Sequence, residues 1–592
     1  MIPVIDLFAG PGGLCEGFSQ AVDGEHPFKA VLSIEKDEIA HRTLTLRAFV
    51  HYFMIRTLDI PDEYYKYVNG IIDRDSLFDA YPDAKVEAES VAWCAELGGS
   101  KVSKASFDAR IRKALAGRRD WLLIGGPPCQ AYSLAGRSRS VGMIQNRDNL
   151  TREEAVAEFN KDPRQRLYRQ YLRIIAVHAP AIFVMENVAG MLSAKVDRKP
   201  VFPQIISDLK EPSKVARKYF SDVRVTKRNK YRIYSFVTGK EESADNGDRF
   251  LIRAEDYGVP QRRHRVILLG IREDFLKGVS VGKLERCDTQ RTVEDAIRDL
   301  PKMKSVISKK GRKDGVTWDA YVAQMTAAPF FAELDADIRN WIVAAEKERE
   351  AFFAPSCVTR IWGRNKSALA EWYDDPKLRQ PLNHEARSHM ATDLWRYLFV
   401  SAYGAAKNHS PVISDFPRAL LPAHANINLD ADDKAQDFAD RFKVQIWGRA
   451  ASTVTSHISK DGHYFIHPDS AQCRSLSVRE AARLQSFPDN YFSALGNDPT
   501  APDNDQSVPP SRGIPHSRPV STAERRIPAP SQRRCSRDIL RTGMATWNPP
   551  ISQNPTIRIA AKRSFAHPSC VTFRFPLARR LSMPMSKTCQ SA

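Results

Sequence analysis

Residues 3–14, PVIDLFAGPGGL, join a short apolar run to a glycine-rich turn. Continuous apolar runs of this length are typical of strands buried on both faces, as in a parallel sheet. Runs of the same character occur at residues 30–34, 121–124, 182–185 and 266–270, and amphipathic stretches such as residues 39–49 and 166–177 separate them. This alternation predicts an α/β fold with a doubly wound, mainly parallel sheet over residues 1–272.

The rest of the chain departs from this rhythm in three places. Residues 60–118 read as a mainly helical insertion between the second and third predicted strands, including helical segments at residues 87–97 and 106–115. Residues 273–470 carry basic stretches and aromatic-rich helices, and we interpret them as a second, smaller domain. Residues 496–592 hold 14 of the 37 prolines and no sustained period, which predicts a disordered tail.

Length and charge narrow the class of protein. A chain of 592 residues suggests two to four domains, and we find no apolar run near the ~18 residues needed to span a membrane. The N-terminus lacks the basic start of a secretion signal, so we expect a cytoplasmic protein.

The net charge of +19 suits a polyanionic partner. The tail alone has 15 Lys/Arg against 5 Asp/Glu, so a solvated basic surface remains an alternative.

The cysteines give no metal-site pattern. All nine are scattered and none forms a CxxC pair, so we predict no metal site and no disulfide framework.

The first two predicted strands end in features that suit a cofactor. Ligands of open α/β sheets bind at the carboxyl ends of the strands. The turn with Gly10, Gly12 and Gly13 lets backbone approach a ligand, although it is not the GxGxxG fingerprint. Glu35 follows the second strand, where a carboxylate can accept hydrogen bonds from ribose hydroxyls. Together they suggest an adenosine-containing cofactor without a pyrophosphate; a tight turn and an exposed carboxylate are the alternative.

The third predicted strand runs into residues 125–130, GGPPCQ. Two glycines followed by two prolines make a stiff loop that presents the thiol of Cys129. Because the thiolate is the reactive form, the nearby Arg137 and Arg139 are significant. We therefore interpret Cys129 as a nucleophile; a buried, inert cysteine is the alternative.

The last two predicted strands add a carboxyl group and a basic run. Glu186 ends the fourth strand and is a candidate proton donor, or else an ion-pair residue. Gln261, Arg263 and Arg265 alternate along an extended segment, so they point to one side. That side could hold a phosphate or orient the thiol loop; an exposed basic strand edge is the alternative.

Five motifs in this order resemble those of DNA (cytosine-5) methyltransferases. Residues 6–18, DLFAGPGGLCEGF, resemble the cofactor motif, and residues 125–133, GGPPCQAYS, resemble the nucleophile loop. Residues 186–190, ENVAG, resemble the acid motif, and residues 261–265, QRRHR, the QxRxR element. Residues 475–489, SLSVREAARLQSFPD, are similar to the segment that closes the recognition domain of that family, and we assign residues 471–495 to it.

The resemblance implies a reaction and a role for each catalytic residue. Cys129 would add to carbon 6 of cytosine, which turns the ring into an enamine that attacks a methyl donor. Glu186 would hydrogen-bond or protonate ring N3. Arg263 and Arg265 would stabilise the loop and the bound nucleotide. Since a base inside a duplex cannot reach such a pocket, the target would be flipped out.

The resemblance also implies a Rossmann-like fold and its cofactor. S-adenosylmethionine would be the methyl donor, with Glu35 on its ribose and Asp59 at its adenine. The remaining implied cofactor contacts are Asp6, Phe8, Gly10, Gly12, Leu14 and Pro127.

The implied partner is double-stranded DNA, read by residues 273–470 through side chains such as Arg360, Arg364, Arg387 and Arg449. We expect a bacterial monomer in a restriction–modification system, paired in function with an endonuclease. A tRNA cytosine-5 methyltransferase and a DNA-binding relic that cannot methylate remain alternatives. A nicotinamide dehydrogenase is disfavoured because it leaves the thiol loop unexplained.

The chain departs from the family pattern at its C-terminal end. The family's closing GNAVPP-like motif, which completes the cofactor pocket, has only partial counterparts at residues 496–498 and 507–510. The composition changes at the same place. This coincidence motivates the hypothesis that a reading-frame change near residues 493–500 replaced the original C-terminus.

Overall fold

The computed structural model describes residues 1–20, 24–128, 165–196, 199–221, 229–277, 280–308, 317–352, 369–422, 441–455 and 462–493, with residues 151, 362 and 458. The predicted tail, residues 496–592, lies outside the described residues. Within the described part of the chain, no helix is both long and apolar enough to cross a membrane.

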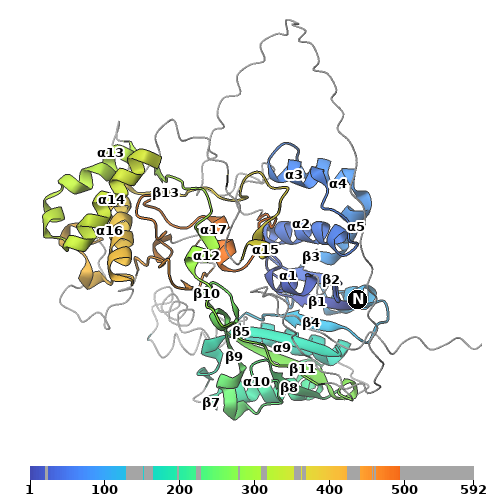
Figure 1. Ribbon diagram of the computed structural model, residues 1–592. Coiled ribbons are helices and arrows are strands. Elements are labelled where there is room, and N and C mark those ends of the chain that lie inside the picture. Colours follow the sequence, from blue (N-terminus) through green and yellow to red (C-terminus); the bar gives the residue numbers. More distant parts are fainter. Residues whose placement is uncertain are drawn as a thin grey trace, which may run out of the picture.

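An eight-stranded mixed sheet organises the N-terminal half of the chain (Figure 1). The strand order is β3-β2-β1-β4-β5-β11-β8, and β9 pairs with β11 beside β8. The first five strands in this order are parallel, while β11 runs antiparallel to β5, β8 and β9. The strands are β1 (Ile2–Leu7), β2 (Phe28–Glu35), β3 (Ala92–Cys94), β4 (Leu122–Gly125), β5 (Ile182–Val188), β8 (Tyr231–Ser235), β9 (Leu251–Arg253) and β11 (His264–Arg272).

The predicted doubly wound, mainly parallel α/β fold is confirmed, and each of the five predicted runs overlaps a strand. The helical insertion predicted for residues 60–118 is only partly right. The third helix of the insertion ends at Val91, within the helical segment predicted for residues 87–97, and the next three residues form β3, the edge strand of the sheet. Three residues are too few for any periodicity to be visible in the sequence, so only pairing with β2 reveals this strand.

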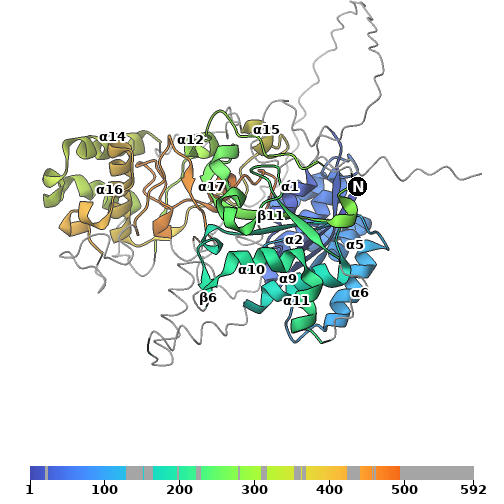
Figure 2. The same ribbon diagram turned by 90° about the horizontal axis from the view of Figure 1, so that it is seen from below.

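Helices cover both faces of the sheet (Figure 2). Side chains such as Ile5, Leu123 and Phe183 pack toward α6, α9 and α10, whereas Val4 and Ile124 belong to the core beside α1. Successive strand residues alternate between the two cores, as the period of two requires. The helices are α1 (Gly13–Ser19), α2 (Glu38–Met54), α6 (Lys104–Leu115), α9 (Gln165–His178), α10 (Val201–Lys210) and α11 (Pro212–Tyr219).

Three short helices of the insertion form a separate core with α2. They are α3 (Asp62–Val68), α4 (Arg74–Ala80) and α5 (Pro82–Val91). Phe49 and Phe53 of α2 pack there with aromatic side chains of the insertion, and Leu378 and Leu382 enter the same core from much later in the chain. The insertion therefore contacts both the sheet domain and the region predicted to recognise DNA.

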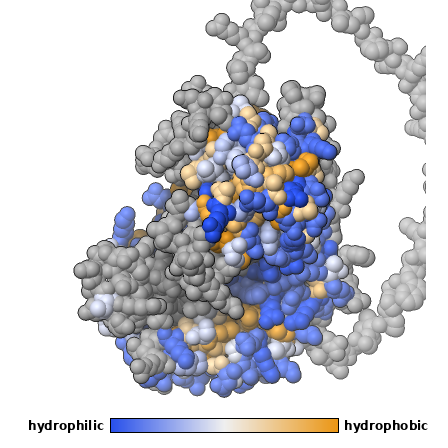
Figure 3. Space-filling view, turned by 90° about the vertical axis from the view of Figure 1, so that its left-hand side faces the viewer, coloured by the Kyte–Doolittle hydropathy of each residue, from blue (hydrophilic) through white to orange (hydrophobic). Residues whose placement is uncertain are grey.

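A helical lobe, which we define as α13, α14, α16 and the loops that join them, lies at the opposite end of the molecule (Figure 1). Its core includes Trp318, Ile342, Leu398 and Phe442. Seen from this end, hydrophobic side chains are scattered among hydrophilic ones (Figure 3). The helices of this part of the chain are α12 (Val293–Ile297), α13 (Trp318–Ala323), α14 (Ala336–Phe352), α15 (Ala370–Tyr373), α16 (Ala391–Lys407) and α17 (Val478–Leu484).

Short strand pairs and 3-10 turns complete the described structure. The pairs are β6 (Lys195–Val196) with β7 (Lys199–Pro200), β10 (Gln261–Arg262) with β14 (Ala451–Ser452), and β12 (Val306–Ile307) with β13 (Ser388–His389). The 3-10 turns are η1 (Ala189–Met191), η2 (Ala244–Phe250), η3 (Ala254–Tyr257), η4 (Glu273–Phe275), η6 (Gln324–Ala327), η7 (Pro329–Glu333), η9 (Ile413–Asp415), η10 (Arg418–Leu420) and η13 (Gly462–Tyr464).

The closing segment, which the structure describes over residues 471–493, is anchored by buried ion pairs. Helix α17 begins with a capping box in which Ser477 and Glu480 bond each other's backbone N–H groups. The fully buried Arg483 donates to Asp489 at 2.7 and 2.8 Å and to Asp299 at 2.6 Å. These charge-assisted bonds fix the chain that leaves α17.

Candidate active site at the carboxyl edge of the sheet

The parallel strands bring four of the predicted motifs to one edge of the sheet. Leu7 at the end of β1 lies beside Ile34 of β2 and Gly125 of β4, and Gly125 lies beside Met185 of β5. The glycine turn, Glu35, the root of the thiol loop and Glu186 therefore follow neighbouring strands at the same level. This is the edge at which open α/β sheets bind ligands.

The glycine turn adopts backbone that favours glycine. Gly10 and Gly12 have φ angles of +58° and +104°, and Phe8 has a φ of +61°. A Cβ atom on Gly10 would meet no atom within 4 Å among the described residues, so open space lies in front of it. Leu14 is half-buried at the start of α1 and packs against the core. Gly10 is thus the turn residue that leaves room for a ligand.

Gly12 and Gly13 face protein atoms instead. A Cβ on Gly12 would lie 2.9 Å from Leu44 Cδ1 and 3.2 Å from the Tyr491 hydroxyl, and a Cβ on Gly13 would lie 2.8 Å from Phe487 Cζ. The side-chain positions of these two glycines are therefore filled by protein atoms, while the predicted approach of their backbone to a ligand stays a prediction. They admit side chains of the closing segment, which sequence spacing could not reveal.

Glu35 is placed as predicted, beside the turn. Its Oε2 accepts a hydrogen bond from the Gly10 N–H at 2.7 Å, and its Oε1 accepts from the N–H groups of Lys36 and Asp37, both at 2.8 Å. Charge-assisted bonds of this kind hold a carboxylate in one orientation. The side chain is thereby preorganised at the edge of the open space.

Asp6 is not placed as a direct cofactor contact. Its side chain is 1% exposed beneath the turn, and its Oδ2 has no hydrogen-bond partner among the described residues. Burial raises the pKa of Asp6 well above its usual value, and the nearby charge of Glu35 adds to this. The buried carboxyl group therefore does not line the open space in front of Gly10.

Asp59 is not brought to this edge. It is exposed and follows α2, a 17-residue helix of about 25 Å that begins beside Glu35 and leads away from it. Nearby Arg56 pairs with Glu87, which also pairs with Lys29 at the opposite end of β2.

The residues after β3, rather than Asp59, lie beside Glu35. The Ala95 N–H donates to the Glu35 backbone carbonyl at 2.8 Å, and Glu96 pairs with Lys36 at 3.4 Å. These residues carry no recognisable signal in the sequence because β3 is hidden within the insertion.

The root of the thiol loop is described as far as Pro128. Cys129 lies outside the described residues, as do Arg137 and Arg139. The buried Pro127 carbonyl accepts a hydrogen bond from Asn187 Nδ2 at 3.3 Å. A Cβ on Gly126 would lie 2.9 Å from Glu186 Oε2. The absence of a side chain at Gly126 therefore lets the Glu186 carboxyl group sit over the loop that carries Cys129.

Glu186 and Arg265 form an ion pair at this point. The Nε of Arg265 lies 2.7 Å from Oε1 of Glu186, although the N–H is not aligned to donate a hydrogen bond. Both side chains are only partly exposed, 26% for Glu186 and 17% for Arg265. The Arg265 Nη1 also donates to the His264 carbonyl at 2.8 Å. Within the described residues, Glu186, Arg265 and the root of the thiol loop at Gly126 therefore lie together.

Gln261 and Arg263 have different partners from Arg265. Gln261 is fully buried: its Nε2 donates to the Leu484 carbonyl at 3.1 Å and its Oε1 accepts from the Val454 N–H at 3.3 Å. Arg263 donates to the Val454 carbonyl at 3.4 Å. A phosphate site that includes Gln261 is therefore excluded by its burial. Gln261 and Arg263 join the sheet domain to β14 and the closing segment.

The four arginines considered for DNA contact separate into three groups. Arg387 donates to the Ile458 carbonyl and is half-buried, whereas Arg449 is exposed just before β14. Arg360 and Arg364 lie outside the described residues.

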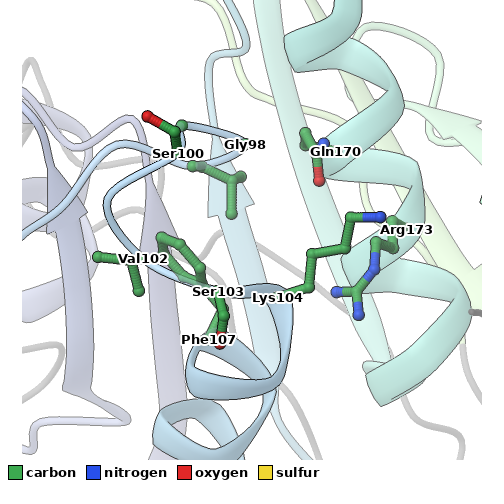
Figure 4. Close-up of a pocket in the computed structure, with 10 residues that line it drawn as sticks. Gly98, Ser100, Val102, Ser103, Lys104, Phe107, Gln170 and Arg173 are labelled. Carbon is green, nitrogen blue, oxygen red and sulfur yellow. The ribbon is translucent and has the colours of Figure 1, made fainter.

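A pocket of about 230 Å³ lies beyond the carboxyl end of β3 (Figure 4). Lys104 at the start of α6 lies across it from Gln170 and Arg173 of α9, and Arg173 pairs with Asp108 at 2.6 Å. None of the residues predicted for catalysis or cofactor binding lines this pocket. It is therefore distinct from the edge formed by Glu35, Gly126 and Glu186.

Comparison with known proteins gives consistent matches. The family model for C-5 cytosine-specific DNA methylase matches residues 108–213 and 247–352, which include Cys129, Glu186, Arg263 and Arg265. The Type II methyltransferase M.Bpa9945I of Bacillus paralicheniformis is 31% identical over 507 residues, covering 82% of this chain and 91% of that protein. The Type II methyltransferase M.DdeI of Desulfomicrobium norvegicum is 27% identical, covering 50% of this chain and 48% of that protein.

Proposed function

The chain belongs to the C-5 cytosine-specific DNA methylase family, and from this premise we propose how it methylates DNA. A methyl group is transferred from S-adenosylmethionine to carbon 5 of a cytosine that is flipped out of duplex DNA. The observation that carries the proposal is the position of the Glu186 carboxyl group, over Gly126 and beside Arg265, at the root of the loop that bears Cys129.

The residues at the sheet edge fit S-adenosylmethionine. The open space before Gly10 admits a ligand, and the Glu35 carboxylate beside it can accept hydrogen bonds from ribose hydroxyls. Phe8, Leu14 and Pro127 adjoin this edge. S-adenosylmethionine supplies an activated methyl group when bound there. The protein binds and orients that group at the same edge as Glu186.

Cys129 and Glu186 act together on the cytosine ring. The Cys129 thiolate forms a bond to carbon 6, and the electron pair displaced toward carbon 5 makes that carbon nucleophilic. Glu186 holds a proton at ring N3, which limits the negative charge on the adduct. After methylation, loss of the proton from carbon 5 expels the Cys129 thiolate and restores the ring.

Arg265 and Arg263 have separate roles in this proposal. Arg265 orients the Glu186 carboxyl group through their ion pair. Arg263 and Gln261 hold the catalytic edge against β14, which places the region of residues 273–470 beside the site. That region reads the DNA sequence, and residues 471–495 close it. The Type II relatives motivate a role as the monomeric modification enzyme of a bacterial restriction system.

Methyl transfer from labelled S-adenosylmethionine tests the proposal. Duplex DNA and tRNA are supplied separately to the unaltered protein and to Glu186→Gln. We expect label in 5-methylcytosine of duplex DNA and none in tRNA, with a rate about 10² to 10⁴ lower for the variant. Label in tRNA alone would indicate the RNA-directed alternative. DNA binding without any transfer would support the inactive relic.

A further inference from the structure

Two aromatic residues of the closing segment pack on the cofactor turn. Phe487 occupies the space beside Gly13, and the Tyr491 hydroxyl lies beside Gly12. The two rings meet edge to face, with centroids 4.8 Å apart. Tyr491 is 5% exposed, and its hydroxyl donates a hydrogen bond to the backbone carbonyl of Pro11. This contact falls between Gly10 and Gly12, at the middle of the turn.

The backbone and hydroxyl of Tyr491 are both held firmly. Arg479 of α17 donates to the Tyr491 carbonyl at 2.7 Å and to the Pro488 carbonyl at 3.0 Å. Burial raises the pKa of the Tyr491 hydroxyl well above its usual value, so it stays protonated and can donate to Pro11. The Tyr491 side chain therefore extends from a backbone held by Arg479 to the Pro11 carbonyl of the turn.

Arg47 of α2 contacts both the Tyr491 ring and the helix that follows the turn. Its guanidinium lies 5.1 Å from the centre of the Tyr491 ring and donates to Glu16 of α1 at 2.5 and 2.7 Å. It also donates to Asn490 Oδ1 at 3.1 Å. Because α1 begins directly after the turn, Arg47 of α2 links Asn490 and the Tyr491 ring to the helix that follows the turn.

The same two residues connect the turn to the insertion and to the region predicted to recognise DNA. Asn490 Nδ2 donates to Asp375 Oδ2 at 3.0 Å, and the Tyr65 hydroxyl donates to the same oxygen at 2.7 Å. The Tyr64 hydroxyl donates to the Asn490 carbonyl at 2.5 Å. The neighbouring residues Asn490 and Tyr491 therefore connect Asp375 to Pro11, each through its own hydrogen bond.

We propose that Tyr491 is a positioning residue that holds the cofactor turn in its binding conformation through the Pro11 carbonyl. The inference rests on the proposed binding of S-adenosylmethionine in front of Gly10. With the hydroxyl in place, the turn keeps its left-handed backbone and its contact with Glu35 before the cofactor arrives. Preorganisation of this kind raises affinity because less ordering occurs on binding.

Tyr491→Phe removes the hydroxyl and keeps the ring packed against Phe487 and Arg47. The matched control is Tyr373→Phe, since Tyr373 is also buried and its hydroxyl donates to a backbone carbonyl, that of Arg483, at 2.5 Å. Tyr373 contacts the closing helix without touching the turn. S-adenosylmethionine affinity is measured by calorimetry, together with thermal unfolding, DNA affinity, and kcat and KM.

We expect Tyr491→Phe to weaken S-adenosylmethionine binding about threefold to tenfold, as the loss of one hydrogen bond implies. KM for S-adenosylmethionine should rise by the same factor, while kcat at saturation and DNA affinity stay unchanged. Tyr373→Phe should lower the unfolding temperature comparably without changing cofactor affinity. Unchanged S-adenosylmethionine affinity in Tyr491→Phe, or an equal loss of affinity in both variants, would overturn the role of Tyr491. Either result would leave the proposed cofactor itself standing. Failure of the unaltered protein to bind S-adenosylmethionine would overturn the proposed cofactor as well.

Discussion

Glu186 and Arg265 face each other from antiparallel strands, with the Arg265 Nε 2.7 Å from Oε1 of Glu186. The pair lies directly over Gly126, where a side chain would collide with the carboxyl group. The ion pair thus lies at the root of the loop that bears the proposed nucleophile.

Substitution of the two family-motif arginines should separate their roles. Arg265→Gln removes the partner of Glu186, so we expect kcat for methyl transfer to fall about 10²-fold with DNA affinity retained. Arg263→Gln removes the contact with the Val454 carbonyl, so we expect KM for DNA to rise more than kcat falls. Steady-state kinetics with varied DNA distinguishes the two. Identical effects on kcat and KM in both variants would contradict separate roles.

A methyl group at Gly126 should displace the acid. Its carbon would lie 2.9 Å from Glu186 Oε2, so the carboxyl group must move. Since small misplacements of catalytic groups are costly, we expect Gly126→Ala to lower kcat about 10²-fold. The control is Gly17→Ala in α1, where a Cβ meets no described atom within 4 Å. That control should keep full activity and similar stability; a Gly126→Ala enzyme with normal kcat would show that the loop tolerates the shift.

Cofactor binding should depend on Glu35 and not on Asp59. Loss of charge-assisted hydrogen bonds predicts that Glu35→Ala raises the Kd for S-adenosylmethionine about tenfold to 100-fold. Asp59→Ala should stay within about twofold of the unaltered protein, because Asp59 is exposed beyond the far end of α2. Calorimetry with S-adenosylmethionine measures both. A larger effect from Asp59 than from Glu35 would contradict the site described.

Stability should fall on acidification because of His389. Burial lowers the pKa of this histidine to about 3, and the positive charge of Arg387 adds to this. A histidine with a depressed folded-state pKa stabilises the fold above its unfolded pKa of about 6.5. That stability is lost as pH falls through the interval toward 3. Between pH 7 and pH 5 the loss should be about 2 kcal/mol.

Urea unfolding at both pH values measures this dependence. His389→Gln cannot titrate, so its unfolding free energy should change less between pH 7 and pH 5 than that of the unaltered protein. The exposed His409 supplies the control, since His409→Gln should leave the pH dependence intact. An unchanged pH dependence in His389→Gln would exclude His389 as the cause.

The central strands could be predicted from sequence because each is a continuous apolar run that is buried on both faces. β3 could not, since Ala92–Cys94 is too short to show a period and is defined by its pairing with β2. The assignment of Asp59 to the adenine rested on the family resemblance, whereas α2 carries that position away from Glu35. The number of residues between two positions does not predict their distance where helices separate neighbouring strands of the sheet.

The parts of the site that the sequence did not reveal are mostly contacts between residues far apart in the chain. Gly12 and Tyr491 are 479 positions apart, and no local signal connects them. The alternation of Gln261, Arg263 and Arg265 was visible, but their separate partners depend on where β14 and α17 fold back. Motif identity could be predicted from the residues, and the contacts between motifs required the structure.

Covalent trapping tests the central claim most directly. Duplex DNA that contains 5-fluorocytosine is incubated with the protein and labelled S-adenosylmethionine, and the products are separated under denaturing conditions. Fluorine cannot leave carbon 5 as a proton does, so the adduct should persist as a protein–DNA complex that carries the label. The account predicts this complex for the unaltered protein and its absence for Cys129→Ser. An equally abundant complex with Cys129→Ser would contradict the assignment of Cys129 as the nucleophile.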